Sequence, residues 1–235
     1  MASHNDPIGL AIQTYAKTKK PFDIIVHADL CEDDIIPIEV LFRSFEEMPE
    51  LEKLALSNSK GKILDVGAGA GIHSLELMDR ALDVTAIDIS PGAVDYMKSI
   101  GINALQSSFL NFNSGKFDTI LMLMNGIGVV GKLSNLKRSL EHAKKLLNTG
   151  GVIYCDSSDI KYLYEDEDGS FWMDLASEYY GDFRFQMSFK QAKSSWFDWL
   201  YVDYDSLHKV ATEVGFTTRK LMEVENHYLA ELVLK

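Results

Sequence analysis

The fold of this chain is decided by residues 62–72, which read KILDVGAGAGI. Residues 62–66 form an apolar run of the length of a buried strand, and the glycines lead into an amphipathic segment that begins at Ile72. Glycine lets the backbone bend sharply and lets a ligand approach the main chain without meeting a Cβ. A helix that begins near Gly71 points its free N–H groups at that ligand, so the turn is predicted to bind an anionic group.

An acidic residue ends the next predicted strand. Residues 84–87 lead into Asp88, seventeen residues after Gly71. In folds of this kind an acid at the C-terminal end of the second strand binds ribose hydroxyls, and we expect Asp88 to do so. The order of strand, glycine turn, helix, strand and acid is much more specific than a glycine turn alone. The alternative is a turn that only joins a strand to a helix.

Short apolar runs alternate with amphipathic segments through the rest of the chain. The predicted strands cover 62–66, 84–88, 104–105, 119–124 and 152–156, and the predicted helices between them cover 72–80, 91–99 and 134–147. Strands joined by helices imply a parallel sheet. After a helix over 204–214, strands at 216–224 and 227–234 are close enough in sequence that they must be antiparallel. The predicted fold is α/β, with a doubly wound, mostly parallel seven-stranded sheet that ends in an antiparallel β-hairpin.

The length of 235 residues suits one such domain with a moderate insertion. Residues 1–60 are predicted to be a helical segment, with one helix over 8–19 and another that begins near Pro37 and stops before Pro49. Residues 61–235 are then the core. Within it, residues 157–203 form an insertion that we expect to be a lid over the substrate.

The acidic composition argues against a nucleic-acid partner. Asp and Glu number 35 against 23 Lys and Arg, and the formal net charge of −12 repels a polyanion. Neither the two cysteines nor the six histidines show a metal-ligand spacing, so no disulfide framework and no metal site are expected. Without a secretory signal or a membrane-length apolar run, we expect a cytoplasmic protein, monomeric or homodimeric, with no membrane partner.

The glycine turn resembles the first motif of the class I, Rossmann-like S-adenosylmethionine-dependent methyltransferases, in which an acid precedes glycines spaced G-x-G-x-G. Asp65, Gly67, Gly69 and Gly71 match this motif, and the resemblance covers residues 61–151. It implies S-adenosyl-L-methionine as the cofactor. The residues expected to bind it are Asp65, Gly67, Ala68, Gly69, Gly71, Ile72, His73, Asp88, Ile89, Ser108, Phe109 and Met124.

The resemblance also implies roles for several of these residues. Asp65 would help to position the methionine end of the cofactor, and Ile89 would lie against the adenine. The family often has an Asp after the third strand that faces the adenine amino group, whereas Ser108, followed by Phe109, occupies that position here. His73 follows the glycine turn and is expected to touch the cofactor carboxylate; the alternative is an exposed histidine without a role.

A nicotinamide dehydrogenase is the rival interpretation of the glycine turn. Its fingerprint is G-x-G-x-x-G. Counting from Gly67 puts Ile72 at the position of the last glycine, and counting from Gly69 puts Ser74 there. This mismatch, the acid inside the first strand and the C-terminal hairpin all favour the methyltransferase.

The polar residue best placed for catalysis is Asn125. It lies in the segment MLMNGIG at 122–128, at the carboxyl end of the fourth strand, where open α/β sheets bind ligands. The segment resembles the Gly-Asn-Ser found there in some small-molecule N-methyltransferases, with Met124 and Gly126 as the flanking residues. We expect Asn125 to be catalytic and Asp156, at the end of the fifth strand, to contact the substrate. The alternative is that Asn125 only satisfies turn backbone.

The insertion is dense in aromatic side chains. Residues 183–190 and 195–202 are predicted to pair as a hairpin with one apolar and one polar face. Such a face can hold an apolar or cationic small molecule, and the alternative is packing against the sheet or in a dimer. The residues expected to contact the substrate are Trp172, Trp196 and Trp199, with Tyr15 from the N-terminal helix.

These features predict an S-adenosylmethionine-dependent methyltransferase that acts on an oxygen or nitrogen atom of a small molecule. A sulfonium methyl group is already activated, so alignment and exclusion of water can suffice, with a general base as an optional aid. The alternatives are a protein side-chain methyltransferase and a non-catalytic protein that binds S-adenosylmethionine.

Overall fold

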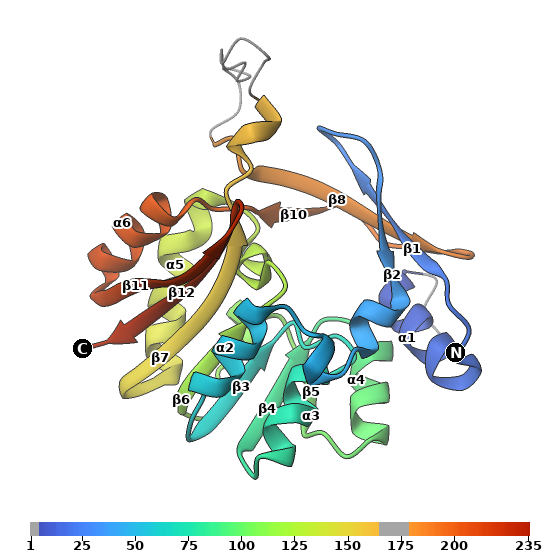
Figure 1. Cartoon of the computed structure of the whole chain (residues 1–235), viewed down its shortest axis with the longest axis horizontal. Coiled ribbons are helices and arrows are strands. Elements are labelled where there is room, and N and C mark those ends of the chain that lie inside the picture. Colours follow the sequence, from blue (N-terminus) through green and yellow to red (C-terminus); the bar gives the residue numbers. More distant parts are fainter. Residues whose placement is uncertain (1–4, 165–178) are drawn as a thin grey trace.

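The computed structural model describes residues 5–164 and 179–235. Its main sheet has seven strands in the order β11-β12-β7-β6-β3-β4-β5 (Figure 1). The five strands from β7 to β5 are parallel, whereas β12 and β11 are antiparallel to their neighbours. The predicted α/β fold is confirmed. The strands are β3 (Lys62–Val66), β4 (Asp83–Asp88), β5 (Ala104–Gln106), β6 (Phe117–Met122), β7 (Leu147–Ser158), β11 (Phe216–Val224) and β12 (His227–Leu234).

Helices cover both faces of this sheet because successive strand residues point to opposite sides. On one face Ile63 belongs to a buried cluster with Leu56 of α2, and on the other Ile120 belongs to a cluster with Leu140 of α5. The sheet is therefore doubly wound, as expected. Its helices are α2 (Glu50–Asn58), α3 (Ile72–Asp79), α4 (Pro91–Ser99), α5 (Leu133–Leu146) and α6 (Tyr204–Val214).

The prediction of an α-helix between Pro37 and Pro49 is wrong. Two short 3-10 helices, η1 (Ile38–Phe42) and η2 (Phe45–Glu47), occupy this segment, and the α-helix α2 begins only after Pro49. Proline favours a helix start rather than a helix end when acidic residues follow it, and Glu50 and Glu52 fill the first turn of α2. The helix over 8–19 is confirmed as α1 (Pro7–Thr18).

A second sheet joins the N-terminal segment to the insertion. Its strands β1 (Asp23–Ala28), β2 (Asp34–Pro37), β8 (Asp182–Phe189) and β10 (Phe197–Leu200) lie in the order β10-β8-β1-β2, and the short β9 (Ala192–Lys193) pairs with β8. The sheet arches over one end of the main sheet (Figure 1). The predicted hairpin of the insertion is confirmed as β8 and β10. The prediction that residues 1–60 are helical is wrong for β1 and β2, which are strands.

Helix α1 docks on α4 through two glycines and a carboxylate. A Cβ added at Gly9 would lie 2.7 Å from the Cα of Gly92, so the two backbones approach without room for a side chain. Buried Asp6 accepts hydrogen bonds from the N–H groups of Gly9 and Gly92, both at 2.9 Å, and from the hydroxyl of Ser90 at 2.8 Å. One carboxylate therefore caps α1 and ties it to the start of α4.

Replacement of Gly9 by alanine is expected to lower the free energy of unfolding by about 1–3 kcal/mol, because the added methyl group overpacks the contact with Gly92. At an ordinary helix position the same change stabilises a protein by about 0.5–1 kcal/mol. Chemical denaturation of both proteins measures the difference. A Gly9→Ala protein more stable than its parent would show that α1 and α4 are not in this close contact.

Candidate cofactor and acceptor site

The glycine turn connects β3 to α3 in a conformation that glycine favours. Gly67, Gly69 and Gly71 have φ angles of 71°, 57° and 80°. A Cβ at Gly71 would collide with Ile102, whereas a Cβ at Gly69 would meet nothing within 4 Å. Gly71 is therefore required by packing. The backbone at Gly69 borders open space that can admit a ligand.

Hydrogen bonds hold this turn against β4. The N–H groups of Gly67 and Ala68 both donate to the carbonyl oxygen of Ile87, at 2.9 and 3.2 Å. Ala68 is buried, and Ile72, the first residue of α3, is partly buried against the core. Main-chain hydrogen bonds and packing against the core thus fix the shape of the turn.

Asp88, at the end of β4, bridges the turn and the start of α4. Its Oδ2 accepts from the N–H of Gly69 at 2.9 Å, and its Oδ1 accepts from the N–H of Ser90 at 2.8 Å. Burial raises the pKa of Asp88, and these two donors oppose that effect. Ser90, not Asp88, caps α4 by accepting from the N–H of Ala93 at 3.0 Å. Each carboxylate oxygen keeps a second lone pair for a ligand hydroxyl.

A hollow of about 370 Å³ begins next to Asp88. It is lined by Ile89, Gln106, Ser107, Ser108 and Asn111. Ile89 is 72% exposed, which leaves a large apolar side chain free to contact a planar ring. Phe109, by contrast, is buried and packs edge-on against His142 with ring centroids 5.2 Å apart. The structure therefore brings Ile89 and Ser108 together on the hollow and places Phe109 in the core.

Asp65 and His73 are buried and engage protein partners. The hydroxyl of Ser74 donates to Asp65 at 2.6 Å, and burial raises the pKa of Asp65. The Nε2 of His73 lies 2.8 Å from one oxygen of Glu52, whose other oxygen pairs with Arg43. Burial would raise the pKa of Glu52, but these two partners lower it overall. His73 is thus paired with Glu52. Its contact with a cofactor carboxylate stays a prediction.

A second turn with positive φ angles follows β6. Met124 and Asn125 have φ angles of 67° and 53°. The buried carboxylate of Asp156 on β7 holds this turn, accepting from the N–H of Met124 at 3.1 Å and from that of Gly126 at 3.0 Å. The Oδ1 of Asn125 accepts from the hydroxyl of Ser158 at 3.1 Å. Met124, Asn125 and Asp156 thus meet at the carboxyl ends of β6 and β7, and Asp156 is largely engaged in supporting the turn.

Sequence reasoning missed His227 at this edge. It is the first residue of β12 and lies opposite Ser158 of β7. Its Nε2 is 2.9 Å from Asp156, and its imidazole is 34% exposed whereas the Asp156 side chain is 1% exposed. The hydrogen bond to Asp156 raises the pKa of His227. The predicted hairpin contained the signal, because a last strand antiparallel to β7 must begin where β7 ends.

The apolar face of the second sheet lies over the same region. It comprises Phe183, Phe185, Met187 and Phe189 of β8 with Phe197 and Trp199 of β10, which lie opposite Phe185 and Phe183. Trp199 packs on Gly128, after β6, and leaves no room for a Cβ there. Phe189 belongs to a buried cluster with Ala11 of α1. The apolar face is thus anchored at the end of β6 and on α1, and its middle spans the carboxyl edge between them.

Two more aromatic residues expected to contact the substrate, Trp196 and Tyr15, pack against other side chains of the protein. Trp196 is 40% exposed and sits beside the guanidinium of Arg184, 5.9 Å from its ring centre, on the polar side of the hairpin. Tyr15 packs against Phe22 and Phe42, with ring centroids 6.3 and 4.6 Å away. Trp172 lies outside the described residues. Their contacts with substrate stay predictions, as does that of Trp199.

Ionisable side chains at this edge pair with each other or with the main chain. Within residues 5–164 and 179–235, no three His, Cys, Asp or Glu side chains gather as a metal site requires. No helix in the same ranges is long and apolar enough to cross a bilayer.

Comparison with known proteins decides which chemistry these features serve. Residues 39–221, more than half of the chain, match the family model described as the methyltransferase domain. The chain belongs to the methyltransferase domain family. The enzyme class and the S-adenosylmethionine cofactor predicted from the glycine turn are confirmed.

Individual relatives agree with this assignment. The methyltransferase is 41% identical to an S-adenosylmethionine-dependent methyltransferase from Bacteroides fragilis crystallised with S-adenosyl-L-homocysteine, over 100% of this chain and 98% of that one, with a TM-score of 0.92. The CcbJ methyltransferase of Streptomyces caelestis shares the fold at 12% identity, with 82% and 99% of the two chains covered and a TM-score of 0.62. A ubiquinone biosynthesis O-methyltransferase of Rickettsia conorii is 29% identical over 109 residues, which are 44% of this chain and only 37% of that protein.

Replacement of Gly69 by alanine is expected to weaken binding of S-adenosyl-L-homocysteine at least about tenfold, or about 1.4 kcal/mol, because the methyl group enters the open space beside the turn. Gly101→Ala is the matched control, since Gly101 has a φ of 88° and equally open surroundings at the far end of α4. Calorimetry measures the affinity of both variants. Equal affinities would show that Gly69 only shapes the turn.

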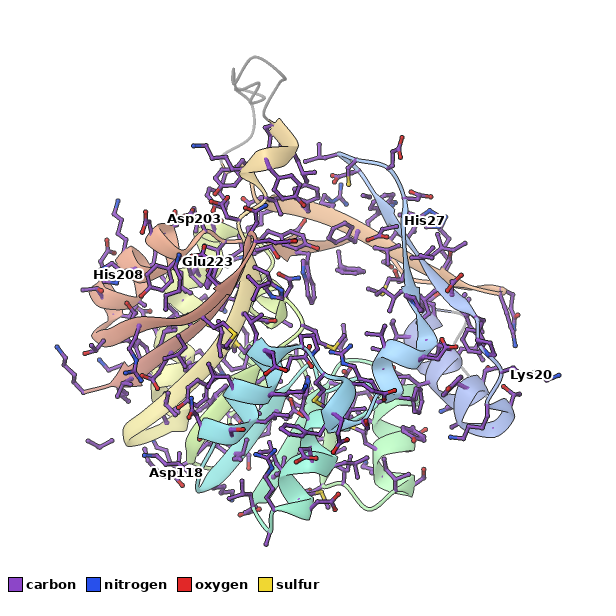
Figure 2. All side chains as sticks on the ribbon, in the orientation of Figure 1. Lys20, His27, Asp118, Asp203, His208 and Glu223 are labelled. Atoms are coloured by element: carbon purple, nitrogen blue, oxygen red, sulfur yellow. The ribbon has the colours of Figure 1, made fainter. Side chains whose placement is uncertain are left out.

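Replacement of Asp88 by alanine should lower cofactor affinity at least about tenfold. It should also lower the melting temperature of the ligand-free protein. Both effects are expected because hydrogen bonds to charged groups contribute about 1.5–3 kcal/mol each. Asp88→Asn should be milder, since its amide oxygen still accepts. Asp118→Ala is the control: Asp118 also holds a backbone N–H, that of Lys62 at 2.8 Å, but lies at the other end of the sheet (Figure 2). Unchanged affinity in Asp88→Ala, together with lost stability, would remove Asp88 from the cofactor site.

Proposed function

We propose that this methyltransferase transfers a methyl group to an oxygen or nitrogen atom of a small molecule held between the 124–126 turn and the apolar face of the second sheet. The observation that carries this proposal is the anchoring of that face at both ends, by Trp199 on Gly128 and by Phe189 beside α1. Between these anchors Phe185 and Phe197 are only partly buried. Large apolar side chains left accessible over a ligand-binding edge suit the apolar part of a small acceptor.

The residues along this edge suit successive parts of the cofactor. Gly69 offers open space for close approach to the main chain, Asp88 offers acceptors for ribose hydroxyls, and Ile89 and Ser108 line a hollow for adenine. Asp65 supports the turn by accepting a hydrogen bond from the hydroxyl of Ser74. When bound there, S-adenosylmethionine supplies a methyl group already activated by its sulfonium.

The remaining work falls on the protein, which must align the acceptor and exclude water. The 124–126 turn, held by Asp156, presents Asn125 at the edge of the sheet. Its Oδ1 is engaged by Ser158, while its Nδ2 makes no hydrogen bond with any residue in the described ranges. That amide can therefore donate to an acceptor oxygen. The similarity to the Rickettsia O-methyltransferase supports oxygen as the atom methylated, with nitrogen as the alternative.

Transfer of label from methyl-labelled S-adenosylmethionine tests this function. A cell extract is separated into small-molecule and protein fractions, and each is incubated with the enzyme and the labelled cofactor. We expect label in the small-molecule fraction. Label confined to the protein fraction would indicate a protein methyltransferase, and label in neither would indicate a binding protein without turnover.

A pair of adjacent residues tests the place of the acceptor. Phe185 lies on the apolar face, whereas the neighbouring Arg184 is exposed on the opposite face. Phe185→Ala should reduce label transfer at least about tenfold, because about 1.4 kcal/mol of lost contact suffices for that factor. Arg184→Ala should leave it unchanged. Equal activity of the two variants would place the acceptor elsewhere.

A further inference from the structure

His227 lies at the acceptor edge, paired with Asp156, and has no part in the roles assigned above. Asp156 accepts three hydrogen bonds, from the N–H groups of Met124 and Gly126 and from Nε2 of His227 at 2.9 Å. The carboxylate is buried beneath the turn that presents Asn125, whereas the imidazole is 34% exposed. The same carboxylate therefore positions the turn and one partly accessible imidazole.

The hydrogen bond determines which nitrogen of His227 carries the proton. An ionised carboxylate only accepts, so a neutral imidazole beside it must keep its proton on Nε2. Nδ1 then has a free lone pair, and it makes no hydrogen bond with any residue among 5–164 and 179–235. A buried carboxylate that holds a histidine in one tautomer and stabilises its protonated form is the arrangement by which aspartate prepares a histidine base.

We propose that Nδ1 of His227 is the general base that takes the proton from the methyl acceptor, an inference that rests on the proposed function. In this step a lone pair of the acceptor oxygen or nitrogen forms the new bond to the methyl carbon. The carbon–sulfur bond breaks with its electron pair left on sulfur, and the acceptor proton passes to Nδ1. Asp156 stabilises the imidazolium until the proton is lost to solvent.

The charged groups around His227 favour this role. The hydrogen bond to Asp156 raises the pKa of His227, burial opposes it, and the carboxylate of Glu52 on α2 adds to the increase. Glu52 is itself paired with Arg43 and with His73 of α3. The base is thus stronger than a free histidine, and it is competent only above its own pKa, where the imidazole is neutral.

Nuclear magnetic resonance of the enzyme saturated with S-adenosyl-L-homocysteine tests the arrangement without turnover. The side-chain nitrogens of His227 should report the Nε2–H tautomer above the pKa, with a pKa above the ordinary value of about 6.5. Asp156→Asn should lower that pKa. The chemical shifts of the His208 side chain, on α6 away from the site, should not respond to Asp156→Asn (Figure 2). An Nδ1–H tautomer, or a pKa unaffected by Asp156→Asn, would overturn the proposal.

Label transfer into the small-molecule fraction tests the chemistry. His227→Gln keeps a hydrogen-bond donor for Asp156 but has no basic nitrogen. This variant should lose at least about a hundredfold in rate. Its affinity for S-adenosyl-L-homocysteine should stay within about twofold of the parent. The parent's rate should rise with pH through the pKa of His227, and His208→Gln should keep this profile. A fully active His227→Gln enzyme overturns the base assignment alone. A parent enzyme that labels no small molecule overturns the proposed function and the base together.

Discussion

Backbone N–H groups left unpaired at the carboxyl edge of the sheet must find acceptors, and two aspartates supply them. Asp88 accepts from Gly69 and Ser90, and Asp156 accepts from Met124 and Gly126. An unsatisfied buried N–H costs about 1–3 kcal/mol, so each carboxylate stabilises a turn that would otherwise be unfavourable. Both turns are therefore held in shape by hydrogen bonds to side chains of the protein itself.

Local patterns in the sequence were enough to predict the main sheet. Strands such as β3 and β6 are mostly apolar and are buried along nearly all of their length, as expected of strands covered on both faces, and the glycine turn marks where β3 ends. The candidate cofactor site follows from that turn and from Asp88. The sequence does not show that the space beside Gly69 is open and the space beside Gly71 is filled. The two glycines differ only because Ile102 packs against Gly71 in the fold.

The parts that could not be predicted depend on contacts between distant segments. Residues 37–49 carry apolar side chains at helical spacing, yet two short 3-10 helices form there, directly after β2, which pairs with β1. The pair of Asp156 and His227 requires the register of β7 against β12, which no single segment contains. Substrate contacts of the insertion likewise depend on how its hairpin joins the N-terminal strands, and they stay predictions.

The second sheet also constrains the order in which the molecule can be completed. His27 of β1 and Ser188 of β8 are hydrogen-bonded although 161 residues separate them. As the chain leaves the ribosome, β1 has only β2 as a neighbour until β8 has been synthesised, so one of its edges stays unpaired through most of translation. Contacts between residues so far apart in sequence form slowly, because the chain loses the entropy of loop closure before the contact contributes any stabilisation. The apolar face of the second sheet is therefore among the last parts of the fold to assemble, so an acceptor site bounded by that face, as proposed, would be completed late in folding.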